Sequence, residues 1–153
     1  MVHYHEGLFN EAVREVCIVS GELGTRNSLY PDKYIAAIEG ALDRDVEVKI
    51  ISGPLIDDDS TLLPFLKIDP RVQLYKLSYR PEQHFRMRDV DKKGKEGKLF
   101  IEEAHAIFEE AKRTYGTTQQ RLLKDYRRLF DSLQRKSIPT TIDDFKIIKL
   151  LQT

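Results

Sequence analysis

The first half of the chain alternates between apolar runs and an amphipathic segment. Residues 16–19 (VCIV) form a continuous apolar run, which is typical of a strand covered on both faces, and VEVKIIS at 46–52 predicts a second strand. Between them, Pro31 suits the first turn of a helix. The apolar residues that follow have helical spacing: Tyr34, Ile35, Ile38, Ala41 and Leu42. This order predicts a βαβ unit with two parallel strands.

The pattern downstream predicts a short helix and then more strands. The acidic segment 57–60 can cap a helix that carries Leu62, Leu63 and Phe65. The segment DKKGKEG at 91–97 contains two glycines and three lysines, which is typical of an exposed hairpin loop, so its flanking strands should be antiparallel. The three strands are predicted at 72–79, 83–90 and 98–103.

From residue 104 the apolar spacing is helical. A stripe over 104–115 predicts a helix that Gly116 closes as a C-cap. Thr117 begins a longer helix with a capping-box pattern, which Pro139 interrupts. Its apolar stripe consists of Leu122, Leu123, Tyr126, Leu129, Phe130 and Leu133. The fold class predicted is α/β, with a mixed sheet of about five strands, flanking helices and extra C-terminal helices.

The length of the chain, 153 residues, predicts one domain over 1–153. We expect a core at about 10–135 and a helical extension at 136–153, in which Thr141 and Asp144 begin a short helix. The extension is rich in apolar residues: Ile142, Phe145, Ile147, Ile148, Leu150 and Leu151. A free monomer would expose them, so the extension should cover a sheet edge or pack on a neighbouring subunit.

The composition indicates a globular protein without an overall electric field. Hydrophobic residues make up 41% and charged residues 33%, and 25 basic residues balance 25 acidic ones. Attraction for phosphate must therefore be local. The single cysteine, Cys17, lies in an apolar run and should be buried, which excludes a disulfide and a cysteine-based metal site. With no signal pattern and no membrane-spanning run, we expect no membrane association and a cytoplasmic location.

Residues 84–91 read HFRMRDVD and fall largely on the strand predicted at 83–90. Side chains alternate between the faces of a strand, so His84, Arg86 and Arg88 should project to one face and the apolar residues between them to the core. The three side chains then follow one another at about 7 Å per two-residue step. Because adjacent cations repel unless an anion or acidic partners lie among them, this face is a candidate phosphate site.

Residues around this strand add positive charge. Between residues 76 and 98 there are eight Lys or Arg and four Asp or Glu, a local charge of +4 in a chain that has none overall. This asymmetry favours a phosphate-bearing ligand. The candidate phosphate-binding residues are Arg80, Arg86, Arg88 and Lys98.

The pattern His84-x-Arg86-x4-Asp91 resembles the His-x-Lys-x4-Asp motif of the phospholipase D superfamily, which includes small single-motif nucleases. The resemblance covers roughly residues 10–135, including the opening apolar strand and a second strand reading VEVKIISG. The length of the chain also resembles that of the single-motif nucleases, which work as homodimers.

This resemblance implies a specific chemistry. His84 would attack phosphorus and form a phosphohistidine, and a second histidine would protonate the leaving oxygen. Arg86, in place of the lysine, would bind nonbridging oxygens, and Asp91 would help to hold the site. No metal or other cofactor is implied. A chain with one motif implies a two-fold homodimer in which the two His84 side chains face each other.

The sequence departs from the family pattern at two places. Arg86 keeps the charge of the lysine but differs in shape and reach. The Gly-Ser-x-Asn segment that is usual downstream is replaced by KLFIEEAH, which supplies Glu102, Glu103 and His105. A carboxylate there could orient the His84 imidazole as a supporting catalytic residue. It could equally neutralise the cations and close the site.

Two functions are therefore expected. The first is a phosphodiesterase, and specifically a metal-independent nuclease that acts as a homodimer through His84. The alternative is a catalytically degenerate module with the same fold that binds nucleic acid, a nucleotide or a protein partner. A solvated or ion-paired strand face would explain His84 and Arg86 without any ligand. The pair Glu102 and His105 more often forms an ion pair than a metal site.

Overall fold

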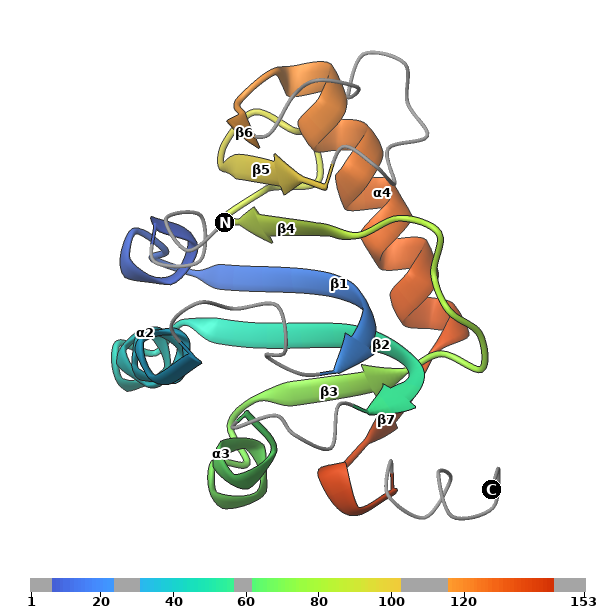
Figure 1. Cartoon of the computed structure of the whole chain (residues 1–153). Coiled ribbons are helices and arrows are strands. Elements are labelled where there is room, and N and C mark those ends of the chain that lie inside the picture. Colours follow the sequence, from blue (N-terminus) through green and yellow to red (C-terminus); the bar gives the residue numbers. More distant parts are fainter. Residues whose placement is uncertain (1–6, 24–30, 57–61, 103–115, 145–153) are drawn as a thin grey trace.

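The protein is a mixed β-sheet between two layers of helix (Figure 1). A computed structural model describes residues 7–23, 31–56, 62–102 and 116–144. The helices are α2 (Pro31–Asp43), α3 (Leu62–Ile68) and α4 (Gln120–Lys136), and residues 7–10 are also helical. The strands are β1 (Glu15–Leu23), β2 (Glu47–Ile56), β3 (Gln73–Lys76), β4 (Phe85–Arg88), β5 (Lys98–Ile101), β6 (Gly116–Thr117) and β7 (Ile138–Thr140).

The described strands form one seven-stranded sheet in the order β6-β5-β4-β1-β2-β3-β7. The central β1, β2 and β3 are parallel, which confirms the predicted βαβ unit. β4 is antiparallel to β1, and β5 is antiparallel to β4, as the loop at 91–97 predicted. The α/β class and the mixed sheet are therefore confirmed, although the sheet has more strands than expected.

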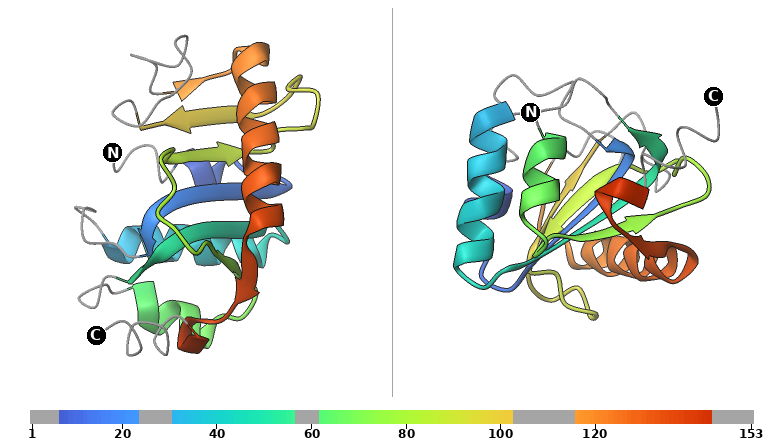
Figure 2. Two further views of the ribbon diagram at one scale, coloured as in Figure 1. Left: turned by 90° about the vertical axis from the view of Figure 1, so that its right-hand side faces the viewer. Right: turned by 90° about the horizontal axis from the view of Figure 1, so that it is seen from below.

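Each face of the sheet carries its own hydrophobic core. α2 and α3 cover one face, and α4 crosses the other (Figure 2). The predicted stripe of α4 packs onto the sheet, and Tyr126 and Phe130 at its centre are fully buried. Burying such an amphipathic helix supplies much of the hydrophobic stabilisation of this face. Cys17 is buried in the same core, as predicted, and burial raises the pKa of its thiol.

Several predicted boundaries were wrong. The strand predicted at 46–52 continues to Ile56 as β2, and its pairing with β1 shifts in register beyond Ser20. Gly116 is not a left-handed C-cap but an extended residue of β6 that pairs with Phe100. Thr117 does not form the predicted capping box: its hydroxyl accepts a hydrogen bond from the Gln119 N–H.

The residues after α4 complete one edge of the sheet. β7 was not predicted, because Pro139 argues against a strand, yet Pro139 is tolerated at the outer edge beside β3. The predicted pairing at the next helix start is confirmed, since Thr141 and Asp144 exchange side-chain to backbone hydrogen bonds of 3.4 Å. The predictions for residues 57–60, 104–115 and 145–151 fall outside the described residues.

Candidate active site

The side chains of β4 alternate as its sequence predicted. Phe85 and Met87 are fully buried in the core beneath α4, whereas Arg86 and Arg88 are half-buried on the opposite face. His84 precedes the strand and continues this alternation, with its side chain 11% exposed. The strand thus directs one imidazole and two guanidinium groups to the face that also carries α2.

Pairing with the neighbouring strands places Glu102 beside His84. β4 pairs with β5 so that Phe85 lies opposite Ile101, and Glu102 donates its backbone N–H to the carbonyl of His84 at 3.2 Å. Side chains at directly paired positions share one face of the sheet. The predicted role of Glu102 as a supporting carboxylate therefore has a geometric basis.

His84 and Glu102 are in direct contact. Nδ1 of His84 lies 3.1 Å from Oε2 of Glu102, whose side chain is 39% exposed. An ionised carboxylate can only accept a hydrogen bond, so we assign the ring proton to Nδ1 from this contact. The lone pair of the neutral imidazole then resides on Nε2, which is the arrangement that a nitrogen nucleophile requires.

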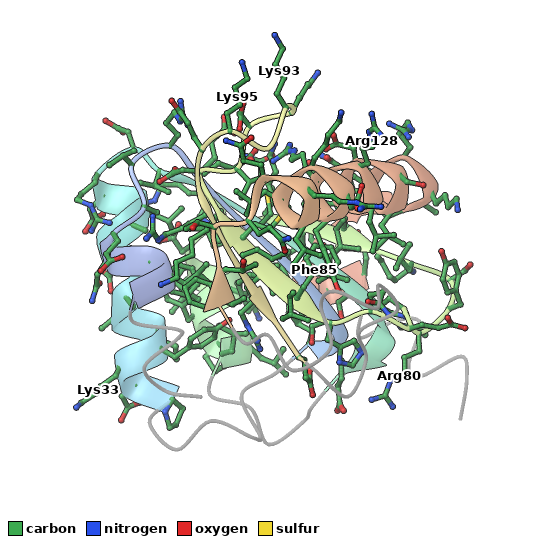
Figure 3. The ribbon with its side chains drawn as sticks, turned by 90° about the horizontal axis from the view of Figure 1, so that it is seen from above. Lys33, Arg80, Phe85, Lys93, Lys95 and Arg128 are labelled. Atoms are coloured by element: carbon green, nitrogen blue, oxygen red, sulfur yellow. The ribbon has the colours of Figure 1, made fainter. Side chains whose placement is uncertain are left out.

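Gly21 in β1 provides the space in which Nε2 lies. A Cβ atom added to Gly21 would lie 2.7 Å from Nε2 of His84 and 2.7 Å from Nε of Arg80. The imidazole and the guanidinium therefore approach the same point of the backbone, and the two nitrogens are separated by at most twice that distance. Arg80, which was predicted to bind phosphate, is exposed and extends from the molecule (Figure 3).

A second glycine lets the segment before β4 cross the end of the sheet. A Cβ on Gly53 in β2 would lie 2.5 Å from the carbonyl oxygen of Gly21 and 3.2 Å from Cα of Arg80. The first contact is closer than a real Cβ atom allows and the second is tight, so a side chain at position 53 would force the backbone to move. Sequence reasoning missed this function of Gly21 and Gly53, because both lie outside the strands that it predicted at 16–19 and 46–52.

The helix on the opposite face anchors the residues on either side of His84. The hydroxyl of Tyr126 donates a hydrogen bond of 3.3 Å to the side-chain oxygen of buried Gln83. The Tyr126 ring also packs edge-on against Phe85, with ring centroids 4.8 Å apart. Burial raises the pKa of Tyr126 to about 12, so its hydroxyl remains a donor at neutral pH.

Arg86 is a half-buried cation on the same face as His84. Its Nε atom is buried and has no hydrogen-bond partner, and among the described residues the structure records no carboxylate paired with it. The charge of Arg86 acts on Tyr34 of α2. Burial raises the pKa of the Tyr34 hydroxyl, and electrostatic attraction by Arg86 opposes this rise. A guanidinium in this environment favours an anionic ligand.

The other predicted phosphate-binding residues have local partners. Arg88 forms an ion pair of 2.8 Å with Glu11. The ammonium of Lys98 lies over the ring of Phe100, 5.3 Å from its centroid, in a cation–π contact. Along β4, Arg88 also lies two residues beyond Arg86 and four residues from His84. These two residues are therefore less available to a phosphate at His84 than Arg80 and Arg86.

Asp91 lies at the other end of β4 from His84. Its carboxylate accepts the Glu96 N–H at 2.9 Å, and this and other backbone N–H groups of the loop lower its pKa. The neighbouring Asp89, with φ of 54°, accepts the N–H groups of residues 13–15 at 2.7–3.0 Å. Asp91 thus organises the β4–β5 loop, while the predicted Glu103 lies outside the described residues.

A shallow, open depression lies beside Asp91, and its lining includes the guanidinium of Arg14. Five carboxylate side chains also line it: Glu15, Asp45, Glu47, Asp89 and Asp91. Within the described ranges, no group of three acidic, histidine or cysteine side chains is arranged to hold a metal ion. None of the helices described is long and apolar enough to cross a membrane.

A mixed sheet with helices on both faces places the protein in the α/β class. No protein-family model matches the chain, and no curated protein matches it. Among solved structures, NucT from Helicobacter pylori is similar with a TM-score of 0.61 and 14% identity, over 90% of this chain and 89% of that one. Nuc from Salmonella typhimurium, a phospholipase D family member, is similar with a TM-score of 0.58 and 11% identity, over 91% and 90%.

TrmBL2, an archaeal chromatin protein that binds DNA, is also similar, with a TM-score of 0.53 and 18% identity. The similarity covers 88% of this chain, which spans about half the length of TrmBL2. At such low identities the likeness establishes the fold and nothing of the activity. It confirms the predicted phospholipase D-like fold, and the roles of the site residues remain predictions.

Proposed function

We propose that the protein is a phospholipase D-like phosphodiesterase that cleaves nucleic acid through His84 without a metal ion. One observation carries the proposal: Glu102 holds Nδ1 of the imidazole, so that Nε2 lies beside Arg80 above Gly21. A nucleophile, the group that orients it and a cation for the phosphate are thereby combined at one end of the sheet. The fold shared with NucT and Nuc is consistent with this chemistry.

The proposed reaction has two displacements at phosphorus. Nε2 of His84 attacks, a nitrogen–phosphorus bond forms, and the bond to the leaving oxygen breaks as that oxygen takes a proton from a second histidine. Water then attacks phosphorus and gives a proton to the second histidine, while the electron pair of the nitrogen–phosphorus bond returns to Nε2. Glu102 stabilises the positive imidazole of the intermediate.

Cations stabilise the charge that develops on the nonbridging oxygens. Arg80 lies beside Nε2, and Arg86 projects from the same face of β4 with its Nε atom unpartnered. A guanidinium can donate two parallel hydrogen bonds to one phosphate, so both groups suit this role. Arg86 therefore stands where the family pattern has lysine and retains its electrostatic function.

The second histidine is proposed to be the His84 of another copy of this chain. One copy supplies a single motif, whereas the two displacements need both a nucleophile and a proton donor. A two-fold axis beside His84 would supply both, because an isologous interface presents the same residue from each side. A homodimer is accordingly part of the proposal.

Cleavage assays test the proposal directly. Wild type should hydrolyse DNA, RNA or bis-p-nitrophenyl phosphate in EDTA, and His84→Ala should lose the activity by at least about 1000-fold. Asp143→Asn, at an exposed position far along the chain, is the control and should retain it. Equal rates for wild type and His84→Ala on every substrate would eliminate the proposal.

A second candidate is a module that binds the same class of ligand without turnover. The observation that favours it is the enclosure of Nε2, which is buried against Gly21 and Arg80 and is not open to solvent. The fold shared with TrmBL2, a DNA-binding chromatin protein, is consistent with it. This candidate predicts salt-sensitive affinity that charge reversal at Arg86 weakens, with no hydrolysis by wild type.

A further inference from the structure

The outer face of α4 is a ridge of cations. The helix contains six Lys or Arg and two Asp residues. Arg121, Lys124, Arg128 and Arg135 are exposed, and their spacing places them within one narrow arc of the helix surface. One of the two acids, Asp131, is close to this arc, but it forms an ion pair of 3.1 Å with Arg127.

The β4–β5 loop extends this ridge. Lys92, Lys93 and Lys95 are exposed on it. Gly94 is buried between them with φ of 70°, and a Cβ there would lie 2.6 Å from the backbone nitrogen of Lys124. The loop is thus docked onto the first turns of α4, and in Figure 3 Lys93, Lys95 and Arg128 extend from the same side of the molecule.

This cationic surface is separate from the site at His84. α4 covers one face of the sheet, whereas His84 and Arg86 project from the other face, which carries α2. Within the described residues, the structure records no ion pair for Lys124, Arg128 or Arg135. The chain has no net charge, so cations gathered on one face indicate a local function.

We infer that α4 and the loop at 92–95 form a second nucleic-acid contact, which binds the phosphate backbone of a duplex. From Arg121 to Arg135 the helix rises about 21 Å, which matches about six base pairs of B-form DNA. The inference shares the nucleic-acid ligand of the proposed function but does not require turnover at His84. In this inference, α4 binds the part of a longer substrate that extends beyond the site at His84.

The chemistry of the helix favours nucleic acid over a membrane. A helix that binds a bilayer needs an apolar face to insert below the headgroups. The apolar face of α4 is buried on the sheet, and the ridge presents only charged and polar groups outward. Contacts of this kind read the phosphate backbone rather than the base sequence, so the affinity should vary little with sequence.

Anisotropy with a fluorescein-labelled 20-base-pair duplex tests the inference, with His84→Ala in every protein to prevent cleavage. Lys124→Gln/Arg128→Gln should weaken binding about tenfold and reduce the slope of log Kd against log salt by about 2. Lys33→Gln/Lys67→Gln is the matched control, because it removes two exposed cations from α2 and α3. The control should change Kd less than twofold.

Two results would overturn the inference. One is an equal loss of affinity in the ridge and control pairs, which would indicate a general charge effect. The other is ridge-dependent binding to phosphatidylserine vesicles that exceeds binding to the duplex. Equal melting temperatures of all variants establish that the ridge pair is folded. Separately, bis-p-nitrophenyl phosphate is too small to reach the ridge, so failure of wild type to hydrolyse it would reject the proposed function and leave this inference standing.

Discussion

The two ends of β4 both concentrate charged groups, yet they use them differently. At the His84 end, Arg80 and Glu102 converge on an imidazole above a glycine, and the Nε of Arg86 has no partner. At the other end, the carboxylate of Asp91 is engaged by backbone N–H groups of the loop that it shapes. One end retains capacity for a ligand, and the other is saturated by the protein itself.

This difference shows that one end of a sequence motif can form a candidate ligand site while its other end has a structural role. Asp91 is seven positions after His84, and the strand between them places their side chains at opposite ends. Changes at the His84 end should therefore reduce activity with little loss of stability, whereas changes at the Asp89–Asp91 end should do the reverse.

The largest expected effect is that of Glu102→Gln. Loss of the carboxylate removes the group that fixes Nδ1–H and stabilises the positive imidazole, so kcat should fall about 1000-fold. The melting temperature should change little, since Glu102 is partly exposed. Steady-state kinetics against Glu82→Gln, an exposed acid of the preceding loop, checks this. A rate within threefold of wild type would contradict the role of Glu102.

Gly21→Ala should have the next largest effect. Its Cβ would meet Nε2 of His84 at 2.7 Å, so the ring must move, and misplacement by about 1 Å can lower kcat about 100-fold. Gly7→Ala is the matched control, because a Cβ at Gly7 meets nothing within 4 Å. Equal kcat values for the two alanine variants would mean that Nε2 is not the reacting atom.

Asp89→Asn should lower stability rather than catalysis. Its carboxylate accepts three backbone N–H groups that fix the entry to β1, and an amide can satisfy fewer of them. The free energy of unfolding should fall by about 2 kcal/mol, measured by urea denaturation beside Asp143→Asn. If Asp89→Asn instead abolished turnover while leaving the unfolding curve unchanged, the two ends of β4 would not differ as described.

Tyr126→Phe tests how the core holds the His84 end. It removes one hydrogen bond to buried Gln83 and should lower the free energy of unfolding by about 1 kcal/mol. It should also lower kcat severalfold with KM unchanged, because Gln83 adjoins His84, the proposed nucleophile. Tyr75→Phe, which loses a comparable hydrogen bond to Gln73, should affect stability alone. Identical kinetics for the two variants would show that Tyr126 does not position His84.

The smallest expected effect is a pH dependence of stability that comes from Glu15, next to the Asp91 end of β4. Burial raises the pKa of Glu15, but hydrogen bonds from Lys49 and Arg127 outweigh it, and the pKa is lowered overall. A lowered pKa stabilises the fold above the ordinary value of the carboxyl, and this stabilisation is lost as pH falls through the lowered value. Between pH 5 and pH 3, the urea midpoint of Glu15→Gln should therefore fall less than that of wild type. Parallel curves would contradict the ion pairs of Glu15.

The sequence predicted much of this contrast but not its cause. Alternation at Phe85 and Met87 was readable because a strand has a period of two, and the helical stripe around Tyr126 was readable for the same kind of reason. The clearance at Gly21 was not readable, because it depends on which segment crosses that glycine. The tertiary fold determines which segments cross, and local sequence patterns carry no information about it.

The same limit applies to the short strands and the buried ion pairs. β6 and β7 contain two and three residues, too few to display a period. The contact of Arg127 with Glu15 joins residues more than a hundred positions apart. The sequence motif nevertheless made His84 a candidate site residue, and Glu102 was predicted as a supporting carboxylate because it lies in the segment that replaces the Gly-Ser-x-Asn of the family pattern. Its direct contact with His84 emerges from strand pairing.

The central claim, that Nε2 of His84 is the phosphate-facing atom and Asp91 is not part of that site, can be tested by one NMR titration. Ring-15N-labelled protein would be titrated with a short oligonucleotide in EDTA at low temperature. We expect an Nδ1–H tautomer whose Nε2 signal shifts on binding, with the same shift in Asp91→Asn. An Nε2 signal that does not respond to saturating oligonucleotide, or that responds in wild type and not in Asp91→Asn, would contradict it.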